Sequence, residues 1–162
     1  MQFEEYVVAR GPSLARLAYA LTGDRHRAED LVQDTLERVC LRWRRVSAAE
    51  RPDAYVRKML VNQHLSWWRR KRNREIAVPA VTESPVPDPS AAVDDRDQIW
   101  KLLGELPDRQ RAVLALRFYA DLDDAGIAEI LRVSPGTVRS HASRALALLR
   151  ERLQNNSVEV VR

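Results

Sequence analysis

The sequence predicts an all-α protein made of two small helical domains joined by a flexible linker. Apolar residues recur every three to four positions along most of the chain, as they do on one face of a helix. The alternation of apolar and polar residues that is typical of strands is absent, and the 162 residues include only five glycines. A hydrophobic content of 45% is enough for one medium domain or two small ones.

The first helix is expected over residues 3–21, and Gly11-Pro12 should kink or split it. Asp24 should cap a second helix that runs to about Trp43. The inward face of this second helix is predicted to carry Ala28, Leu31, Val32, Leu36 and Val39. An acidic and amide row lies between them, made of Glu29, Asp30, Gln33, Asp34 and Glu37. Such a row is usually a solvated helix face, but it could also dock a basic partner.

A third helix should open at Arg51-Pro52-Asp53. It carries one polar row, with Leu60 and Trp67 roughly opposite; the row consists of Asn62, Ser66, Arg69 and Asn73. Trp67-Trp68 precedes a basic run over 69–74, and this combination suits single-stranded nucleic acid, because rings stack on bases while cations bind the backbone. The alternative is that both tryptophans belong to the core and the basic run is a solvated helix end. Between these two interpretations, we expect one tryptophan in the core and the other at a DNA surface.

The composition changes abruptly over residues 79–97, which hold half of the chain's eight prolines and five acidic residues against one base, Arg96. Such a segment cannot bury a core, so we expect a mobile linker over 77–97. Its charge would suit a basic channel on a partner, although a plain tether is the simpler interpretation. The linker divides the chain into domains at 1–76 and 98–154, and residues 155–162 are expected to form a frayed tail.

The second domain should begin with a helix that buries Ile99, Leu102, Leu103 and Leu106. Pro107 should start the next helix, whose apolar residues are Val113, Leu114 and Leu116. A short helix then follows, with Ile127, Ile130 and Leu131 on one face. Ser134 is expected to cap a last helix that begins at Pro135, because serine accepts hydrogen bonds from free N–H groups and proline suits the first helical position.

The helix from Pro135 sorts its residues onto two sides. At about 100° per residue, one side carries Val138, Ala142, Ala145 and Leu149. The other side carries Gly136, Arg139, Ser140, Ser143 and Arg144. Small residues permit close approach, and arginines can reach phosphates or guanine edges. The pattern predicts a helix-turn-helix whose second helix enters the major groove of DNA; an amphipathic hairpin with solvated arginines is the alternative.

Composition limits the remaining possibilities. The formal net charge of +4 permits nucleic-acid binding without requiring it. Cys40 is the only cysteine, so no disulfide framework is expected and the compartment should be reducing. Glu4, Glu5 and Arg10 interrupt any signal peptide, and no apolar run approaches the roughly 20 residues of a membrane span. We therefore expect a soluble cytoplasmic protein.

Enzymatic residues are not recognisable in the sequence. His26, His64 and His141 lack ligand-like spacing, and Cys40 has no histidine or base beside it. An acidic helix start accounts for Asp123-Asp124, and no glycine-rich phosphate loop is present. We expect a protein that is not an enzyme and needs neither a metal nor a cofactor.

Three stretches, RAEDLVQDTLERV, PDAYVRKMLVNQHLSWWRRKRNRE and LPDRQRAVLALRFYADLDDAGIAEILRVSPGTVRSHASRALALLRERL, resemble the sigma factors of bacterial RNA polymerase. The short two-domain layout is similar to the extracytoplasmic-function (ECF) group, and the arginine-rich style is similar to its actinobacterial members. The resemblance covers about residues 3–153. It implies a factor that binds the β′ clamp helices and β flap of core polymerase and directs initiation at promoter DNA, and it makes an anti-sigma factor plausible.

The resemblance also implies roles for three sets of residues. The family's D-L-x-Q-[DE] helix, which docks on the β′ clamp helices, corresponds to Asp30, Leu31, Gln33 and Asp34. The helix that opens the minus-ten element and holds non-template bases corresponds to Asn62, Ser66, Trp67, Arg69 and Arg70. The helix that reads the minus-thirty-five element corresponds to Pro135, Gly136, Thr137, Arg139, Ser140 and Arg144. The sequence departs from the family at His141, where many members carry arginine; this side chain should contact a phosphate or simply pack.

Two other functions fit part of the sequence. A helix-turn-helix regulator of the response-regulator type would need a receiver domain, but residues 1–76 show no βαβ alternation. A polymerase-binding regulator that does not melt promoters is the other possibility.

Overall fold

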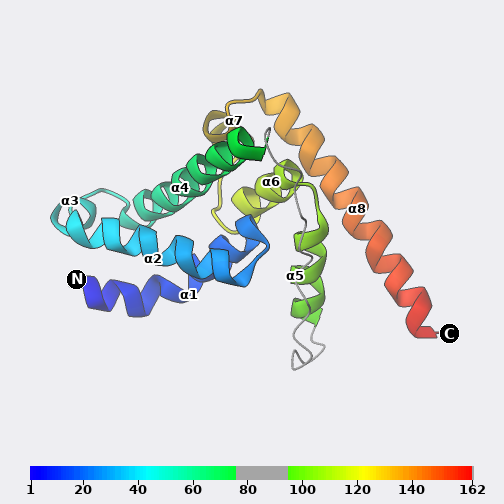
Figure 1. Ribbon diagram of the computed structural model, residues 1–162, viewed down its shortest axis with the longest axis horizontal. Coiled ribbons are helices and arrows are strands. Elements are labelled where there is room, and N and C mark those ends of the chain that lie inside the picture. The colour runs from blue at the N-terminus through cyan, green and yellow to red at the C-terminus, as the bar shows by residue number, and fades with distance from the viewer. Residues whose placement is uncertain (76–94, 162) are drawn as a thin grey trace. The chain divides into compact units, whose positions relative to one another are not determined.

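The computed structural model describes residues 1–75 and 95–161, and these residues form eight helices and no strand (Figure 1). The chain divides into two compact units, Met1–Ala91 and Ala92–Arg162. The predicted all-α class with two helical domains is therefore confirmed. The predicted linker lies outside the described residues, except that 95–97 already belong to the first helix of the second unit.

The first unit contains four helices: α1 (Phe3–Thr22), α2 (Arg25–Leu41), α3 (Trp43–Ser47) and α4 (Pro52–Glu75). Pro12 lies inside α1, which is a single helix, so the predicted split is wrong. The predicted kink stays a prediction. Burial of Tyr6 on one side of Pro12 and of Leu14 and Leu17 on the other keeps both halves of the helix on the core. The predicted end of α1 is confirmed, because Gly23 has a left-handed φ of 66° and donates its N–H to the carbonyl of Tyr19.

The core of the first unit lies between α1, α2 and α4, which pack on one another (Figure 1). Of the predicted inward residues of α2, Ala28, Leu31 and Val39 are buried, whereas Val32 and Leu36 remain partly exposed. Helical spacing did not reveal that Thr35 is fully buried too. Its hydroxyl donates a 2.7 Å hydrogen bond to the carbonyl of Leu31, so the polar group is satisfied within the helix.

Near Trp43 the chain departs from the prediction. Helix α2 ends at Leu41, and Trp43 begins the separate short helix α3. The indole ring of Trp43 packs against Phe3 and Tyr6 of α1, with ring centroids 5.6 Å and 5.3 Å apart. These aromatic contacts bring the chain back toward α1 before α4 begins.

The second unit contains α5 (Asp95–Glu105), α6 (Asp108–Phe118), α7 (Asp124–Leu131) and α8 (Pro135–Val161). Its core includes Leu103, Leu106, Leu114 and Ala145, and the predicted apolar residues of α6 are buried. Ile99, predicted to be inside, is 46% exposed. The frayed tail predicted from residue 155 is also wrong, because α8 continues to Val161. Just before this segment, Arg152 of α8 forms an ion pair with Glu105 of α5.

Candidate nucleic-acid interface and docking surface

Side-chain caps start both α7 and α8, and a left-handed residue ends α7. Asp123 caps α7 by accepting a 2.8 Å hydrogen bond from the N–H of Gly126. Arg132 ends α7 with a left-handed φ of 58°. The hydroxyl of Ser134 accepts a 3.1 Å hydrogen bond from the N–H of Thr137, so the predicted start of α8 at Pro135 is confirmed.

The two aspartates that start α7 have structural partners. Asp123 provides the cap, and the carboxylate of Asp124 pairs with the guanidinium of Arg117 on α6. The predicted explanation of Asp123-Asp124 as an acidic helix start is therefore confirmed.

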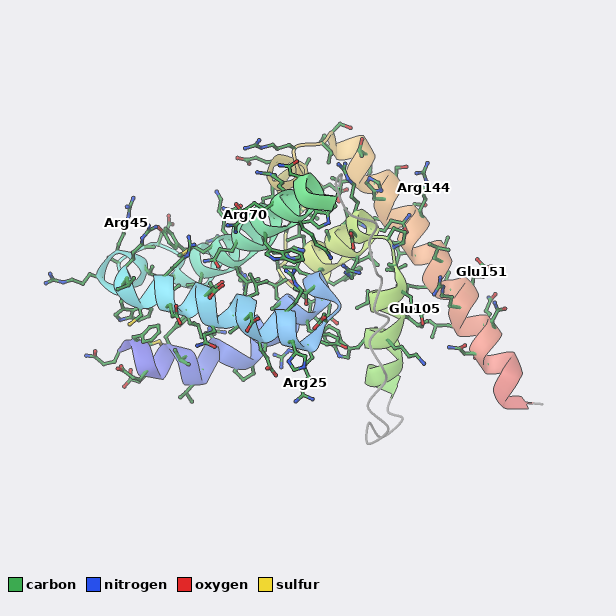
Figure 2. All side chains as sticks on the ribbon, in the orientation of Figure 1. Arg25, Arg45, Arg70, Glu105, Arg144 and Glu151 are labelled. Atoms are coloured by element: carbon green, nitrogen blue, oxygen red, sulfur yellow. The ribbon has the colours of Figure 1, made fainter. Side chains whose placement is uncertain are left out.

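The α8 helix separates its two faces as predicted. Val138, Ala142 and Ala145 are buried in the domain. The opposite face is exposed and carries Gly136, Arg139, Ser140, Ser143 and Arg144. Pro135 is exposed beside them, while Thr137 is partly buried with its hydroxyl 2.9 Å from that of Ser134. Figure 2 shows Arg144 projecting from α8.

The arginines of this face are available to a ligand. Within the described ranges, Arg139 and Arg144 take part in no ion pair. His141 lies differently: it is partly buried, and its Nδ1 atom is buried without a hydrogen-bond partner among the described residues. One edge of this ring therefore faces the domain.

A second polar surface lies along α4. Each member of its predicted row is exposed; the row consists of Asn62, Ser66, Arg69 and Asn73. Leu60, predicted on the opposite side, is fully buried. Arg70 is also exposed, and Figure 2 labels it on α4. Amide, hydroxyl and guanidinium groups thus follow one another on a single helix face.

Neither tryptophan of the Trp67-Trp68 pair is fully buried, so the prediction that one of them belongs to the core is wrong. The guanidinium of Arg27, from the first turn of α2, lies over the ring of Trp67, and the Lys71 Nζ atom is 5.2 Å from the ring centroid. The imidazole of His64 stacks on the same indole at a centroid distance of 6.4 Å and an interplanar angle of 19°. Trp67 is thus held by side chains of its own chain, which periodicity in the sequence could not indicate.

The acidic and amide row of α2 is exposed from Glu29 to Glu37, as a solvated face should be. Asp30, Gln33 and Asp34 therefore face solvent, whereas Leu31 is only 7% exposed and belongs to the core. The predicted cap of this helix is confirmed, because the carboxylate of Asp24 accepts a 3.2 Å hydrogen bond from the N–H of Arg27.

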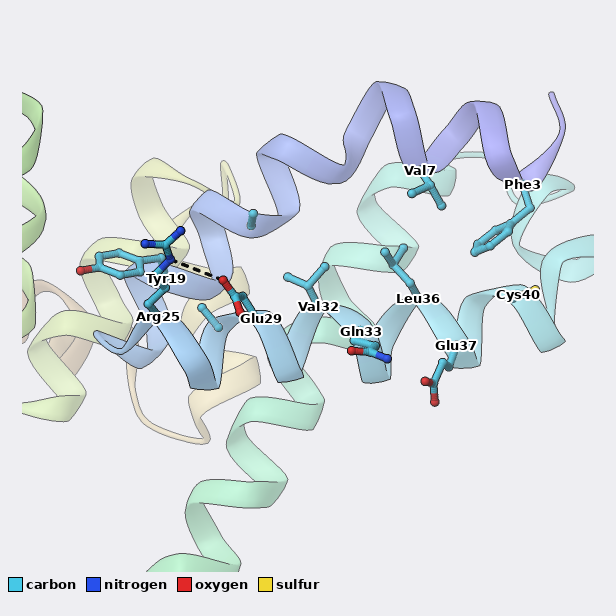
Figure 3. Close-up of a pocket in the computed structure, with 12 residues that line it drawn as sticks. Phe3, Val7, Tyr19, Arg25, Glu29, Val32, Gln33, Leu36, Glu37 and Cys40 are labelled. Carbon is cyan, nitrogen blue, oxygen red and sulfur yellow. Dashed lines mark ion pairs between the residues drawn. The ribbon is translucent and has the colours of Figure 1, made fainter. Parts of the chain in front are cut away.

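Beside this row lies an apolar groove of about 680 Å³ between α1 and α2 (Figure 3). Val32 and Leu36 point into it from α2, and Phe3 and Val7 line it from α1. Gln33 and Glu37 of the polar row are also part of its lining. The prediction that Val32 and Leu36 lie in the core is wrong, because helical periodicity cannot distinguish a core-facing side chain from one that lines a groove.

The described ranges offer neither a cluster of metal ligands nor a membrane-spanning helix. No three His, Cys, Asp or Glu side chains in residues 1–75 and 95–161 are grouped so that they could hold a metal ion. None of the helices in these ranges combines the length and the hydropathy that a transmembrane span requires.

Comparison with known proteins gives consistent matches. Residues 7–74 match the family described as Sigma-70 region 2, and residues 96–149 match Sigma-70, region 4. The RNA polymerase sigma-E factor of Streptomyces coelicolor is 37% identical over 153 residues, or 94% of this chain and 86% of that protein. The ECF RNA polymerase sigma factor SigL of Mycobacterium tuberculosis is 32% identical over 150 residues, or 90% of this chain and 85% of that protein. Among solved structures, the sigma factor RpoE of Bartonella quintana, in complex with the anti-sigma factor NepR, is similar with a TM-score of 0.71, 27% identity, and coverage of 94% of this chain and 96% of that one.

Proposed function

The chain belongs to the sigma-70 family of RNA polymerase sigma factors and to its ECF group, and from this membership we propose which surfaces bind polymerase and which bind promoter DNA. As a sigma factor, it acts in promoter-specific transcription initiation. The response-regulator alternative is not favoured, because the N-terminal unit matches sigma region 2 over residues 7–74.

The polymerase-docking surface is the exposed face of α2 together with the apolar groove beside it. Asp30, Gln33 and Asp34 would meet the β′ clamp helices, and Val32 and Leu36 would bury apolar surface in the same contact. The acidic row would set register and association rate, while apolar burial would supply most of the affinity. Leu31 would act from the core, by holding α2 in place.

The minus-ten surface is the exposed row of α4. Asn62 and Ser66 would hold unpaired non-template bases, since their amide and hydroxyl groups can both donate and accept hydrogen bonds. Arg69 and Arg70 would bind the backbone of the same strand. Asn62 lies on the well-packed part of α4, beside the buried residues Leu60 and Val61, so it would be presented on a rigid support.

The minus-thirty-five surface is the outward face of α8. Gly136 and Ser140 would allow the helix to approach the major groove closely, and Arg139 and Arg144 would reach base edges or phosphates. Pro135 and Thr137 lie in the first turn, where helix N–H groups and the positive end of the helix dipole would face the DNA backbone.

The two promoter-binding surfaces act together. One domain, over 1–76, binds polymerase and the minus-ten element, and the other, over 98–154, contacts the β flap and the minus-thirty-five element. Binding of either domain raises the effective concentration of the other near its own DNA element. The protein contributes binding energy and no catalytic chemistry, and it works in the cytoplasm with polymerase and promoter DNA.

An anti-sigma factor is a further partner in this proposal. The B. quintana sigma factor RpoE, whose fold this chain shares, was solved in complex with the anti-sigma factor NepR. A similar inhibitor would keep this chain from polymerase by covering one of the surfaces described above.

The observation that carries the proposal is the separation of buried and exposed residues on α8 next to a capped helix-turn-helix. The test is transcription by purified core polymerase on a library of promoter fragments, with and without the protein. We expect transcripts from a defined subset of fragments, and only when the protein is present. Polymerase binding without any transcript would instead support a regulator that does not melt promoters.

A further inference from the structure

Arg27 and Trp67 join the two functional helices of the N-terminal unit. Arg27 lies in the first turn of α2, one helical turn before Asp30. Trp67 lies on α4, and in the sequence it falls between Ser66 and Arg69, two residues of the exposed polar row. The guanidinium lies over the indole ring, so this contact connects the proposed docking helix to the proposed strand-holding helix.

The contact lies where α4 leaves the core. Leu65 is the last buried residue among the described side chains of α4, and residues after it are at most partly buried. The stack is partly shielded from water, because the Nη1 atom of Arg27 is buried and His64, which stacks on Trp67, is buried as well. A cation over an aromatic face is held more strongly in such surroundings than in water.

Arginine suits this position better than lysine. Its planar guanidinium can lie flat on an indole, whereas an ammonium group interacts as a compact point charge. A guanidinium held over the ring limits the movement of the indole. It therefore restrains the part of α4 that carries Arg69 and Arg70.

We propose that Arg27 is a positioning residue that couples polymerase docking to promoter opening by holding Trp67, and with it the basic end of α4, against α2. The inference rests on the proposed function of α2 and α4. A fixed helix end loses little conformational freedom when it receives the unpaired strand, so strand capture costs less free energy. Trp67 then acts mainly inside the protein, as the support on which the basic end of α4 rests.

The test combines Arg27→Met, Trp67→Leu, the double variant and the conservative variants Arg27→Lys and Trp67→Phe. Arg27→Met keeps the length and apolar contact of the side chain but removes its charge. We expect it to keep the wild-type affinity for core polymerase while lowering the open-complex fraction, measured by permanganate reactivity, about three- to tenfold. Arg27→Met should lower the open-complex fraction little further in the Trp67→Leu background. The conservative variants Arg27→Lys and Trp67→Phe should each lose less of the open-complex fraction than Arg27→Met and Trp67→Leu do.

The second measurement needs neither polymerase nor DNA. Amide hydrogen exchange in the free full-length protein should become faster over residues 66–75 in Arg27→Met, while residues 14–21 of α1 and the second unit exchange as before. This result distinguishes the present inference from the proposed function. If Asn62→Ala opened promoters normally, the role assigned to α4 would fail, yet the exchange measurement would still decide whether Arg27 holds the helix.

Three results would overturn the proposal. The first is unchanged hydrogen exchange over 66–75 in Arg27→Met. The second is promoter opening at the wild-type level in that variant. The third is an equal loss from Arg27→Met in the wild-type and Trp67→Leu backgrounds, because Arg27 would then act independently of the indole, for example on a phosphate. If Trp67→Leu fails to fold, Trp67→Met replaces it in the cycle with Arg27→Met, because methionine also removes the aromatic face.

Discussion

Val138 and Arg139 are consecutive residues of α8, yet the side chain of Val138 is completely buried and that of Arg139 is exposed. The same division recurs one turn later, where Ala142 is buried and Ser143 is exposed. A step of about 100° per residue puts neighbours on different sides of the helix. Substitutions on the outward face should therefore change DNA binding without unfolding the domain.

We predict that Arg139→Ala and Arg144→Ala weaken promoter recognition while leaving thermal stability nearly unchanged. If an arginine contacts guanine, its loss should remove about 1–3 kcal/mol of discrimination at one base pair. If it contacts a phosphate, all sequences should bind less well and the salt dependence should become shallower. Binding to matched and mutated minus-thirty-five elements at two salt concentrations separates the two cases.

The control for this experiment is Ala142→Arg. Ala142 is buried on the same helix, so an arginine there would place a charge in the core and should unfold the domain. If both outward variants kept wild-type affinity and sequence preference, α8 would not be the reading helix.

Local signals in the sequence predicted much of the fold. Asp24 and Ser134 cap helices where expected, because a side-chain oxygen at that position satisfies free N–H groups whatever the tertiary surroundings. The two faces of α8 and the exposed row of α4 were also predicted, since both follow from helical geometry alone. These features depend on residues within a few positions of one another.

Features that depend on tertiary packing could not be predicted. The spacing of Val32 and Leu36 is that of core residues, but both side chains line the groove between α1 and α2 instead. The contact of Trp67 with Arg27 joins residues that are far apart in the sequence. The length of α8 was underestimated, because the helix continues beyond Arg152, whose pairing with Glu105 on α5 no local pattern reveals.

We predict that Leu36→Gln weakens binding to core polymerase by about 1–2 kcal/mol, since it removes apolar surface that docking would bury. Leu41→Gln is the matched control, because Leu41 lies on the same helix and is 87% exposed outside the groove. Asp30→Arg and Gln33→Ala should also weaken binding, with circular dichroism unchanged. Fluorescence anisotropy measures the affinity of each variant for core polymerase. Equal affinities of Leu36→Gln and Leu41→Gln would exclude the groove from the interface.

We predict that Asn62→Ala forms closed complexes normally but opens promoters poorly. Asn62 is exposed on α4, so its amide is free to bind a base, and its loss leaves the core intact. Losing a hydrogen bond to an unpaired base should cost about 1 kcal/mol or more. Permanganate footprints of the minus-ten region should be weaker at equal polymerase occupancy, and footprints of wild-type strength would show that Asn62 does not contact the strand.

We predict that the N-terminal unit loses stability above about pH 10, and that Tyr6 contributes to this loss. Burial raises the pKa of the Tyr6 phenol, and the neighbouring Asp53 carboxylate raises it further. The unfolded chain therefore releases this proton at a lower pH than the folded chain does. Stability is fully present below the unfolded pKa and falls as pH rises above it, by at most about 1.4 kcal/mol per pH unit for this group.

Tyr6→Phe is the variant that tests this origin, because phenylalanine keeps the ring but cannot ionise. Its stability, measured by urea unfolding between pH 8 and pH 11, should decline less steeply than that of the wild type. Parallel curves for the two proteins would assign the alkaline loss to other groups.

We predict that Gly136→Ala stabilises the free protein but weakens its binding to DNA. A Cβ atom at Gly136 would meet nothing closer than Arg139 Nη2 and Ser134 Oγ, both at 3.8 Å, so alanine fits there. Replacing glycine within a helix should raise the free energy of unfolding by up to about 1 kcal/mol. The same methyl group would stand on the outward face, where it would separate the helix from the DNA.

Gly126→Ala provides the contrast on the neighbouring helix. Its Cβ atom would lie 3.1 Å from the Asp123 Oδ1 atom, which the N–H of Gly126 already holds at 2.8 Å as the cap of α7. The carboxylate cannot move away without weakening that hydrogen bond. This substitution should therefore leave the free energy of unfolding unchanged or lower it. Thermal unfolding and DNA titration of both variants test the pair, and the prediction fails if Gly136→Ala binds the promoter as tightly as the wild type does.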